Sequence, residues 1–145
     1  MDSTESLMLA KYHLSIAERM FNNYFGFREK RFIIGAINEL ARATKNLIKA
    51  YLILEKKPRK NQNKNIISFQ KISNKHITQE LTSDLLKILE IHEAQKKSPV
   101  EFEKKNKIIL LVLGKYKILT IERLSSLINS TKEAIKLFPK NFRQV

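Results

Sequence analysis

The sequence predicts an all-α fold, an up-and-down bundle of four to five helices, from three observations. Apolar residues recur at alternating steps of three and four in several long segments, which places them on one face of a helix. The chain of 145 residues holds only three glycines and three prolines, which disfavours turn-rich β folds. Its length and its apolar content of 43% suit one domain with a single core. Within residues 1–145 we expect a helical hairpin (5–57), a basic connector (58–76) and C-terminal helices (77–139).

Two long helices joined by a short turn should form an antiparallel hairpin. Asp2 to Thr4 can cap the first helix, and Gly26 is expected to end it. Its apolar stripe is Leu7, Ala10, Leu14, Ala17, Phe21 and Tyr24. The stripe of the second helix is Ile33, Ile37, Leu40, Leu47, Tyr51 and Leu54, interrupted only by Thr44. Pro58 is expected to end this helix, and Ile34, Ile48, Leu52 and Ile53 are apolar residues beyond its stripe.

The connector is the most basic part of the chain. From Lys56 to Lys75 there are seven basic residues and no acidic one. The first half, Arg59 to Asn65, is polar and like-charged, so we expect it to be mobile. The second half should dock on the bundle through Ile66, Ile67, Phe69 and Ile72.

The C-terminal part should contain a helix from about Thr78 to Lys96 and another after Thr120, which Pro139 ends. Between them, Ser98-Pro99-Val100-Glu101 has the residues of a helix start. The apolar run from Ile108 to Leu113 favours a helix, with a short extended segment near residues 108–119 as the alternative. Residues 121–138 also approximate a helix-turn-helix with Asn129 at the turn, which would indicate a DNA-binding protein.

The charge of the chain predicts an anionic partner. The formal net charge is +14, and a charge of that size speeds encounters with RNA or another polyanion. A lysine-rich proteome would produce the same excess without a function. The candidate nucleic-acid-binding residues follow one edge of the second helix and continue into the connector: Arg42, Lys45, Lys49, Lys56, Lys57, Arg59, Lys60 and Lys64.

The residues that carry chemistry are sparse. Without cysteine there is no disulfide, thiolate nucleophile or cysteine-ligated zinc, which agrees with a cytoplasmic protein. His13, His76 and His92 lack partners at metal-ligand spacing, and there is no glycine-rich phosphate loop. We therefore expect no catalytic, cofactor-binding or metal-binding residues, no membrane-spanning segment and no signal peptide.

Aromatic residues cluster around the turn between the first two helices: Phe21, Tyr24, Phe25, Phe27 and Phe32. They are expected to close the end of the bundle or to form a homodimer contact. The alternative is that they stack on unpaired bases beside Arg28, Lys30 and Arg31.

The hairpin resembles the HEPN superfamily. The resemblance is carried by AKYHLSIAERMFNNYF (10–25) and AINELARATKNLIKAYLIL (36–54), above all by Ala43, Ala50 and the segment from Leu47 to Leu52. The segment from Ser98 to Lys105 is similar to one in uncharacterised archaeal relatives. Catalytic HEPN domains are ribonucleases with an arginine followed, four to six residues later, by a histidine, and no arginine here has a histidine at that distance.

The resemblance therefore implies a non-enzymatic role. In HEPN domains such roles include binding RNA or nucleotides, dimerising, and partnering a nucleotidyltransferase-like protein. Together with the charge, this predicts a helical module that binds RNA or another polyanion. A homodimeric protein–protein scaffold is the alternative. Two copies would pair through the aromatic turn or through the surplus apolar residues of the second helix: Ile34, Ile48, Leu52 and Ile53.

Overall fold

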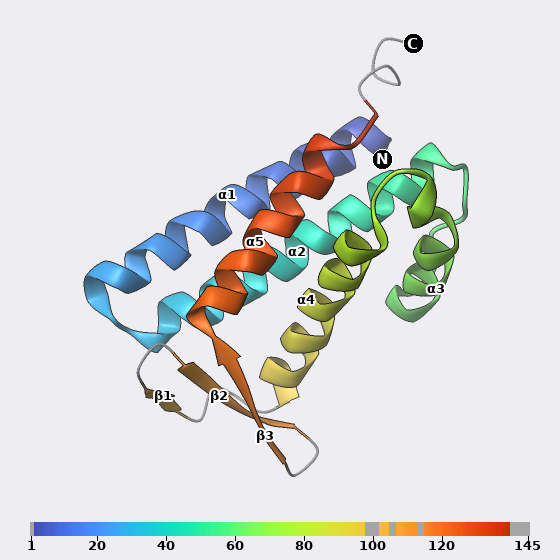
Figure 1. Ribbon diagram of the computed structural model, residues 1–145. Helices are drawn as coiled ribbons and strands as arrows, with labels where there is room; N and C mark the ends of the chain where they lie inside the picture. Colours follow the sequence, from blue (N-terminus) through green and yellow to red (C-terminus); the bar gives the residue numbers. More distant parts are fainter. Residues whose placement is uncertain (1, 98–101, 105–106, 113–114, 140–145) are drawn as a thin grey trace.

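Four long helices run up and down beside one another and form the body of the protein (Figure 1). The computed structural model describes residues 2–97, 102–104, 107–112 and 115–139. The four helices are α1 (Ser3–Phe27), α2 (Lys30–Leu54), α4 (Gln79–Lys97) and α5 (Ile121–Lys136). α1 packs on α2 and α5, and α4 packs on the same two helices, which closes a four-helix bundle. The predicted helical-bundle fold is confirmed.

The predicted apolar stripes of α1 and α2 form one face of the core. All six stripe residues of α1 are buried, and on α2 only Leu54 is partly exposed. Thr44, which interrupts the stripe, is buried because its hydroxyl donates to the Leu40 carbonyl at 2.9 Å. Ile48 and Leu52 are also buried, so they are core residues and not the surplus apolar surface that was predicted. A stripe widens in this way when a helix is covered by neighbours on several sides.

The ends of the hairpin helices are set by capping. The carboxylate of Asp2 accepts from the Glu5 N–H at 2.8 Å, which confirms the predicted N-cap of α1. The same helix continues through Gly26 and ends at Arg28, whose φ of 53° is left-handed. The expectation that Gly26 ends α1 was therefore wrong, because the left-handed position falls two residues later.

α2 ends before Pro58, contrary to the prediction. The Lys57 N–H donates to the Leu52 carbonyl at 2.8 Å, and the Lys56 N–H donates to the Ile53 carbonyl at 3.0 Å. With Lys56 at a φ of 55°, these bonds make a Schellman motif, which satisfies the last carbonyls of the helix.

The connector contains a helix that the sequence did not predict, α3 (Gln62–Ile72), followed by the 3₁₀ turn η1 (Ser73–Lys75). Helix α3 packs on α2 beside the bundle (Figure 1). Phe69 and Ile72 are buried and Ile66 packs against the core, which confirms that the second half docks. Ile67 is 53% exposed, so its predicted part in the docking was wrong. In the first half, residues 59–61 have no regular secondary structure, but helix α3 begins at Gln62 and buries Asn65. The expectation that this half has nothing to bury was therefore wrong.

α5 is one uninterrupted helix with the predicted cap. Thr120 accepts from the Arg123 N–H at 3.0 Å, and helical structure then continues to Lys136. Asn129 lies within it, so the turn that a helix-turn-helix needs is absent from residues 121–136. The alternative of a DNA-binding motif at residues 121–138 was therefore wrong.

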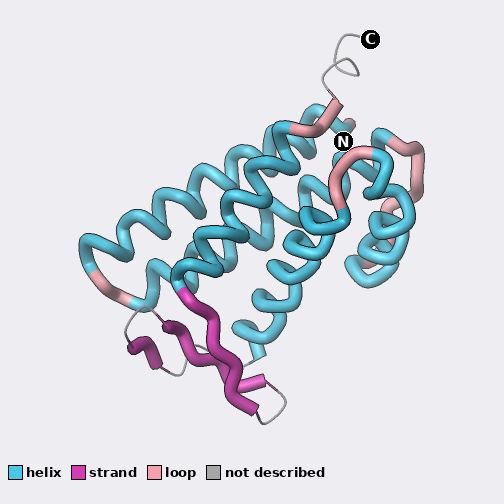
Figure 2. Tube along the Cα trace, in the orientation of Figure 1, coloured by secondary structure: helices cyan, strands magenta, loops and turns pink. Residues whose placement is uncertain are grey.

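A three-stranded antiparallel sheet lies at the end of the bundle where α4 finishes and α5 starts (Figure 2). Its strands are β1 (Phe102–Lys104), β2 (Lys107–Val112) and β3 (Lys115–Thr120), in that order. Ile109 pairs with Phe102 on one side and with Ile118 on the other. Ser98–Glu101 lie outside the described residues, but the helix predicted to follow them is wrong at Phe102–Lys104 and Lys107–Val112, which are strands. The extended alternative is confirmed at residues 108–112 and 115–119, where two paired strands replace the single short segment that was expected. Ile- and Val-rich segments favour strands once a pairing partner is present.

Among the described residues, no helix combines the length and the apolar character needed to cross a lipid bilayer.

Candidate nucleic-acid interface

The three predicted residues on the basic edge of α2, Arg42, Lys45 and Lys49, differ in their exposure to solvent. Arg42 and Lys49 are exposed, whereas Lys45 is half-buried. Arg42 donates to the Glu39 carboxylate at 2.9 Å on its own helix. Lys49 and Lys45 are one turn apart, so their ammonium groups extend from the same side of α2.

Three of the predicted residues converge on one pocket. Lys45 and Lys49 of α2 and Lys60 of the α2–α3 loop line a recess of about 190 Å³. The remaining lining residues are the amides Gln62 and Asn65 of α3 and three apolar residues: Ile48, Ile66 and Leu89. None of the lining residues is acidic. The recess therefore combines cations, amide groups and an apolar surface.

The loop that carries Lys60 is held by α3. The Lys60 backbone N–H donates to the side-chain oxygen of buried Asn65 at 2.7 Å. Asn61 caps α3 by accepting from the Lys64 N–H at 3.0 Å. The first turn of α3 contains no acidic residue, so the positive end of its helix dipole lies beside the pocket without a local carboxylate.

α4 brings two further residues, Lys96 and His92, close to Lys45, and the sequence did not indicate this. Burial lowers the pKa of Lys45, and the positive charge of Lys96 lowers it further, while Glu93 acts in the opposite direction. Burial, followed by the charges of Lys45 and Lys96, also lowers the pKa of His92. No pattern in the sequence indicates this grouping, because the packing of α4 against α2 creates it.

The other predicted basic residues do not line the pocket. Lys56, Lys57, Arg59 and Lys64 are exposed, and Lys56 and Lys57 form the turn that ends α2. Lys56, Lys57 and Arg59 lie between α2 and α3, and Lys64 lies in the first turn of α3. All four add to the positive field around the pocket.

Two histidines form carboxylate pairs across the fold that sequence spacing could not reveal. The Nδ1 atom of His13 on α1 is 2.6 Å from the Glu39 carboxylate on α2, whose other oxygen accepts from Arg42. His76 lies 3.5 Å from Glu55. Burial alone would raise the pKa of Glu55, but Lys75 and His76 together lower it. No group of three potential metal ligands occurs among residues 2–97, 102–104, 107–112 and 115–139.

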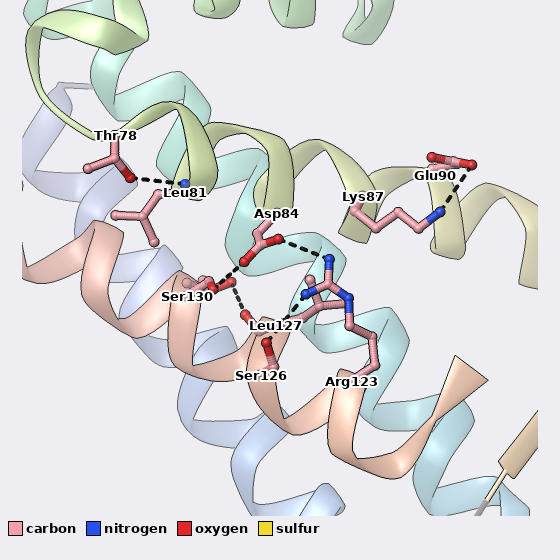
Figure 3. Close-up of polar contacts among 10 residues, drawn as sticks. Thr78, Leu81, Asp84, Lys87, Glu90, Arg123, Ser126, Leu127 and Ser130 are labelled. Atoms are coloured by element: carbon pink, nitrogen blue, oxygen red, sulfur yellow. Dashed lines mark hydrogen bonds and ion pairs between the residues drawn. The ribbon is translucent and has the colours of Figure 1, made fainter. Parts of the chain in front are cut away.

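A larger open cleft of about 580 Å³ lies between α4 and the end of α3. Its charged lining residues pair within the protein (Figure 3). Arg123 donates to Asp84 at 3.0 Å, and Lys87 is 3.5 Å from Glu90. Ser130 donates to the other oxygen of Asp84 at 2.6 Å. This network fastens α5 to α4, which gives the cluster a structural role.

The aromatic cluster at the α1–α2 turn divides into core and surface. Phe21 and Tyr24 are buried, as their place in the apolar stripe predicted. Phe25 and Phe27 are 46% and 64% exposed, so they do not close the end of the bundle. Arg28 lies 5.6 Å from the ring centroid of Phe25. The turn thus presents two exposed aromatic rings next to an arginine.

No protein family, curated protein or solved structure matches this chain.

Proposed function

We propose that the protein is a non-enzymatic, HEPN-like helical module that binds RNA. The observation that supports this most directly is the convergence of Lys45, Lys49 and Lys60 on one pocket without an acidic lining residue. Two of these lysines come from α2 and the third from a loop that α3 holds in place. Basicity from a lysine-rich proteome alone would not require such a grouping.

Electrostatics supplies the affinity in this proposal. Each phosphate contacted by a lysine or arginine releases condensed counterions, so affinity depends steeply on salt. The net charge of +14 raises the rate of encounter with a polyanion. No helix-turn-helix is present at residues 121–136 to read a DNA groove, which favours RNA over duplex DNA as the partner. We expect little sequence preference, because phosphate contacts carry no base information.

A charge-neutralising triple variant tests this proposal. We expect Arg42→Gln, Lys45→Gln and Lys49→Gln together to weaken the binding of a fluorescently labelled single-stranded RNA. If each contacts one phosphate, the slope of log affinity against log salt should flatten by about 2. The matched control neutralises exposed Lys11, Arg19 and Lys136 on α1 and α5 and thus has the same net charge.

Binding is measured by fluorescence anisotropy over a salt series. A duplex DNA of the same sequence as the RNA is measured for comparison. Equal affinity and equal slope in the two triple variants would overturn the proposed site. Tighter binding of the duplex DNA than of the RNA would show that the partner is DNA and not RNA.

A homodimer is the second candidate, and one observation favours it. Phe25 and Phe27 are exposed at the α1–α2 turn, where two copies related by a two-fold axis could bury both rings. The earlier alternative surface at Ile48 and Leu52 is not available, because both are in the core. We expect Phe25→Ser with Phe27→Ser to convert a dimer into a monomer in analytical ultracentrifugation. A wild type that is monomeric at high concentration would exclude the dimer.

The HEPN resemblance extends the proposal in two respects. A nucleotidyltransferase-like protein is the protein partner that the resemblance suggests, and the absence of cysteine fits a cytoplasmic location. Co-purification with such a protein and fractionation of cells would test them separately.

A further inference from the structure

The lysine pocket has features of a receptor for one compact anion, beyond those of a generally basic surface. It is concave, and its cations reach it from two directions, from α2 and from the α2–α3 loop. Ile48, Ile66 and Leu89 provide its apolar surface. Ion pairs of partly buried groups are screened less than pairs on an open surface, so half-buried Lys45 should contribute more than exposed Lys49 and Lys60.

The size of the pocket restricts the ligand. At about 190 Å³ it is smaller than the pockets that enclose drug-sized ligands, which start at about 300 Å³. This space can enclose a phosphate group with part of its sugar, and the rest of a nucleotide would extend outside it. An internal phosphodiester continues into a sugar on both sides, so it cannot enter a small recess as deeply as a terminal phosphate.

The charge state of the surroundings favours a dianion. Lys45 lies near the positive charges of Lys49, Lys96 and Arg42, and Glu93 is the one anion that offsets them at this lysine. Partial burial, and after it this repulsion, lowers the pKa of Lys45. A terminal phosphate carries close to two negative charges at neutral pH and would relieve the repulsion. Gln62 and Asn65 bring amide groups to the same recess, and amides can donate to phosphate oxygens.

We propose that the recess between α2, the α2–α3 loop and α3 binds a phosphomonoester, with Lys45, Lys49 and Lys60 as its cationic ligands. The inference rests on the proposed function to the extent that the phosphate belongs to an RNA 5′ end. The same chemistry would also accept the phosphate of a small free compound. In either case the phosphate occupies the recess and its substituent extends outward.

The experiment has an RNA arm and a phosphate arm. The RNA arm compares one oligoribonucleotide bearing a 5′-phosphate with the same oligonucleotide bearing a 5′-hydroxyl. We expect the phosphorylated form to bind the wild type about tenfold more tightly, equivalent to ~1.4 kcal/mol. Lys49→Gln should reduce this ratio to about one, because it removes a cation from the recess. Lys57→Gln is the matched control, since it removes an exposed charge outside the recess and should change both affinities by the same factor.

The phosphate arm measures thermal unfolding with inorganic phosphate against chloride at matched ionic strength. Phosphate should raise the Tm of the wild type and of Lys57→Gln, but not that of Lys49→Gln. Because Lys49 is exposed, the variant should fold, and its Tm in chloride verifies this.

Each combination of results has a distinct meaning. If the RNA affinity is independent of the 5′ group and the Tm does not respond to phosphate, the recess is not a phosphomonoester site, but the proposed RNA-binding function survives. A specific response to phosphate without a 5′ preference assigns the recess to a free phosphate compound. A response to phosphate with no RNA binding keeps the recess and removes the RNA function. No response in either arm overturns both.

Discussion

Tyr51 joins the hairpin to the last helix through one buried hydrogen bond, and its loss should be measurable. Its hydroxyl donates to the backbone carbonyl of Ala134 at 3.0 Å. Ala134 lies in the last turn of α5, where carbonyls lack helical partners. The neighbouring carbonyls of Glu133 and Ile135 accept from Leu137 and Phe138, so Tyr51 supplies the corresponding donor for Ala134.

The structure sets the size of the effect. Tyr51 is 1% exposed, and burial raises the pKa of its hydroxyl, so the group stays protonated and able to donate. Tyr51→Phe keeps the ring contacts with Phe69, His76 and Phe138 but leaves the Ala134 carbonyl without its donor. An unsatisfied buried acceptor costs about 1–3 kcal/mol. At about 2–4 °C per kcal/mol for a chain of this size, we expect the Tm to fall by several degrees.

Urea unfolding followed by circular dichroism at the helical band measures this free energy. Tyr12→Phe is the matched control, because Tyr12 is 59% exposed and its ring contacts His13 on the surface of α1. The control should stay within about 0.5 kcal/mol of the wild type. If Tyr51→Phe did so as well, the Ala134 carbonyl would have another partner, and the assignment of this bond as the link to α5 would be refuted.

Two further predictions concern stability. Gly26 lies inside the last turn of α1, and a Cβ placed there would meet nothing within 4 Å, so Gly26→Ala should stabilise the protein by about 0.5–1 kcal/mol in urea unfolding; a loss of stability would contradict the helical assignment of this turn. Burial and the charges of Lys45 and Lys96 hold the pKa of His92 below its ordinary value of 6.5, so the unfolded chain takes up the proton first. The free energy of unfolding should therefore keep the full His92 contribution above pH 6.5 and should lose it as the pH falls from 6.5 through the folded-state pKa. In urea unfolding series from pH 7.5 to about pH 5, His92→Gln should show a smaller decline than the wild type. Parallel declines would refute the role of His92.

The sequence was most informative where structure is decided locally. In α1 and α2 the apolar period identified the buried stripe, and Asp2 and Thr120 were recognised as caps because a cap bonds to an N–H three residues away. The ends of the helices were less predictable. Gly26 and Pro58 were expected to end helices, but the turns are made by Arg28 and Lys56, which adopt left-handed conformations that their residue types do not announce.

The proposed binding site was predictable only as separate residues. The basic edge of α2 and the lysines of the connector were identifiable from charge and spacing. Their convergence on one recess depends on α3, and residues 62–65 carry no clear helical pattern. Lys96 and His92 were missed because they belong to a different helix whose packing brings them near Lys45. That RNA or a phosphate group binds there stays a prediction.

The sequence by itself therefore determined the helical class, the hairpin and the excess of positive charge, because periodicity, capping and composition act over one or a few turns of chain. Tertiary structure decided the rest. The apolar run Ile108 to Leu113 carries no period that separates helix from strand, and the pairing of Lys107–Val112 with Lys115–Thr120 gives residues 108–112 an extended conformation. The position of α3 on α2, the His13–Glu39 and Arg123–Asp84 pairs and the lysine recess all join residues from different elements. Such contacts form only when the helices pack, so no local pattern in the chain records them.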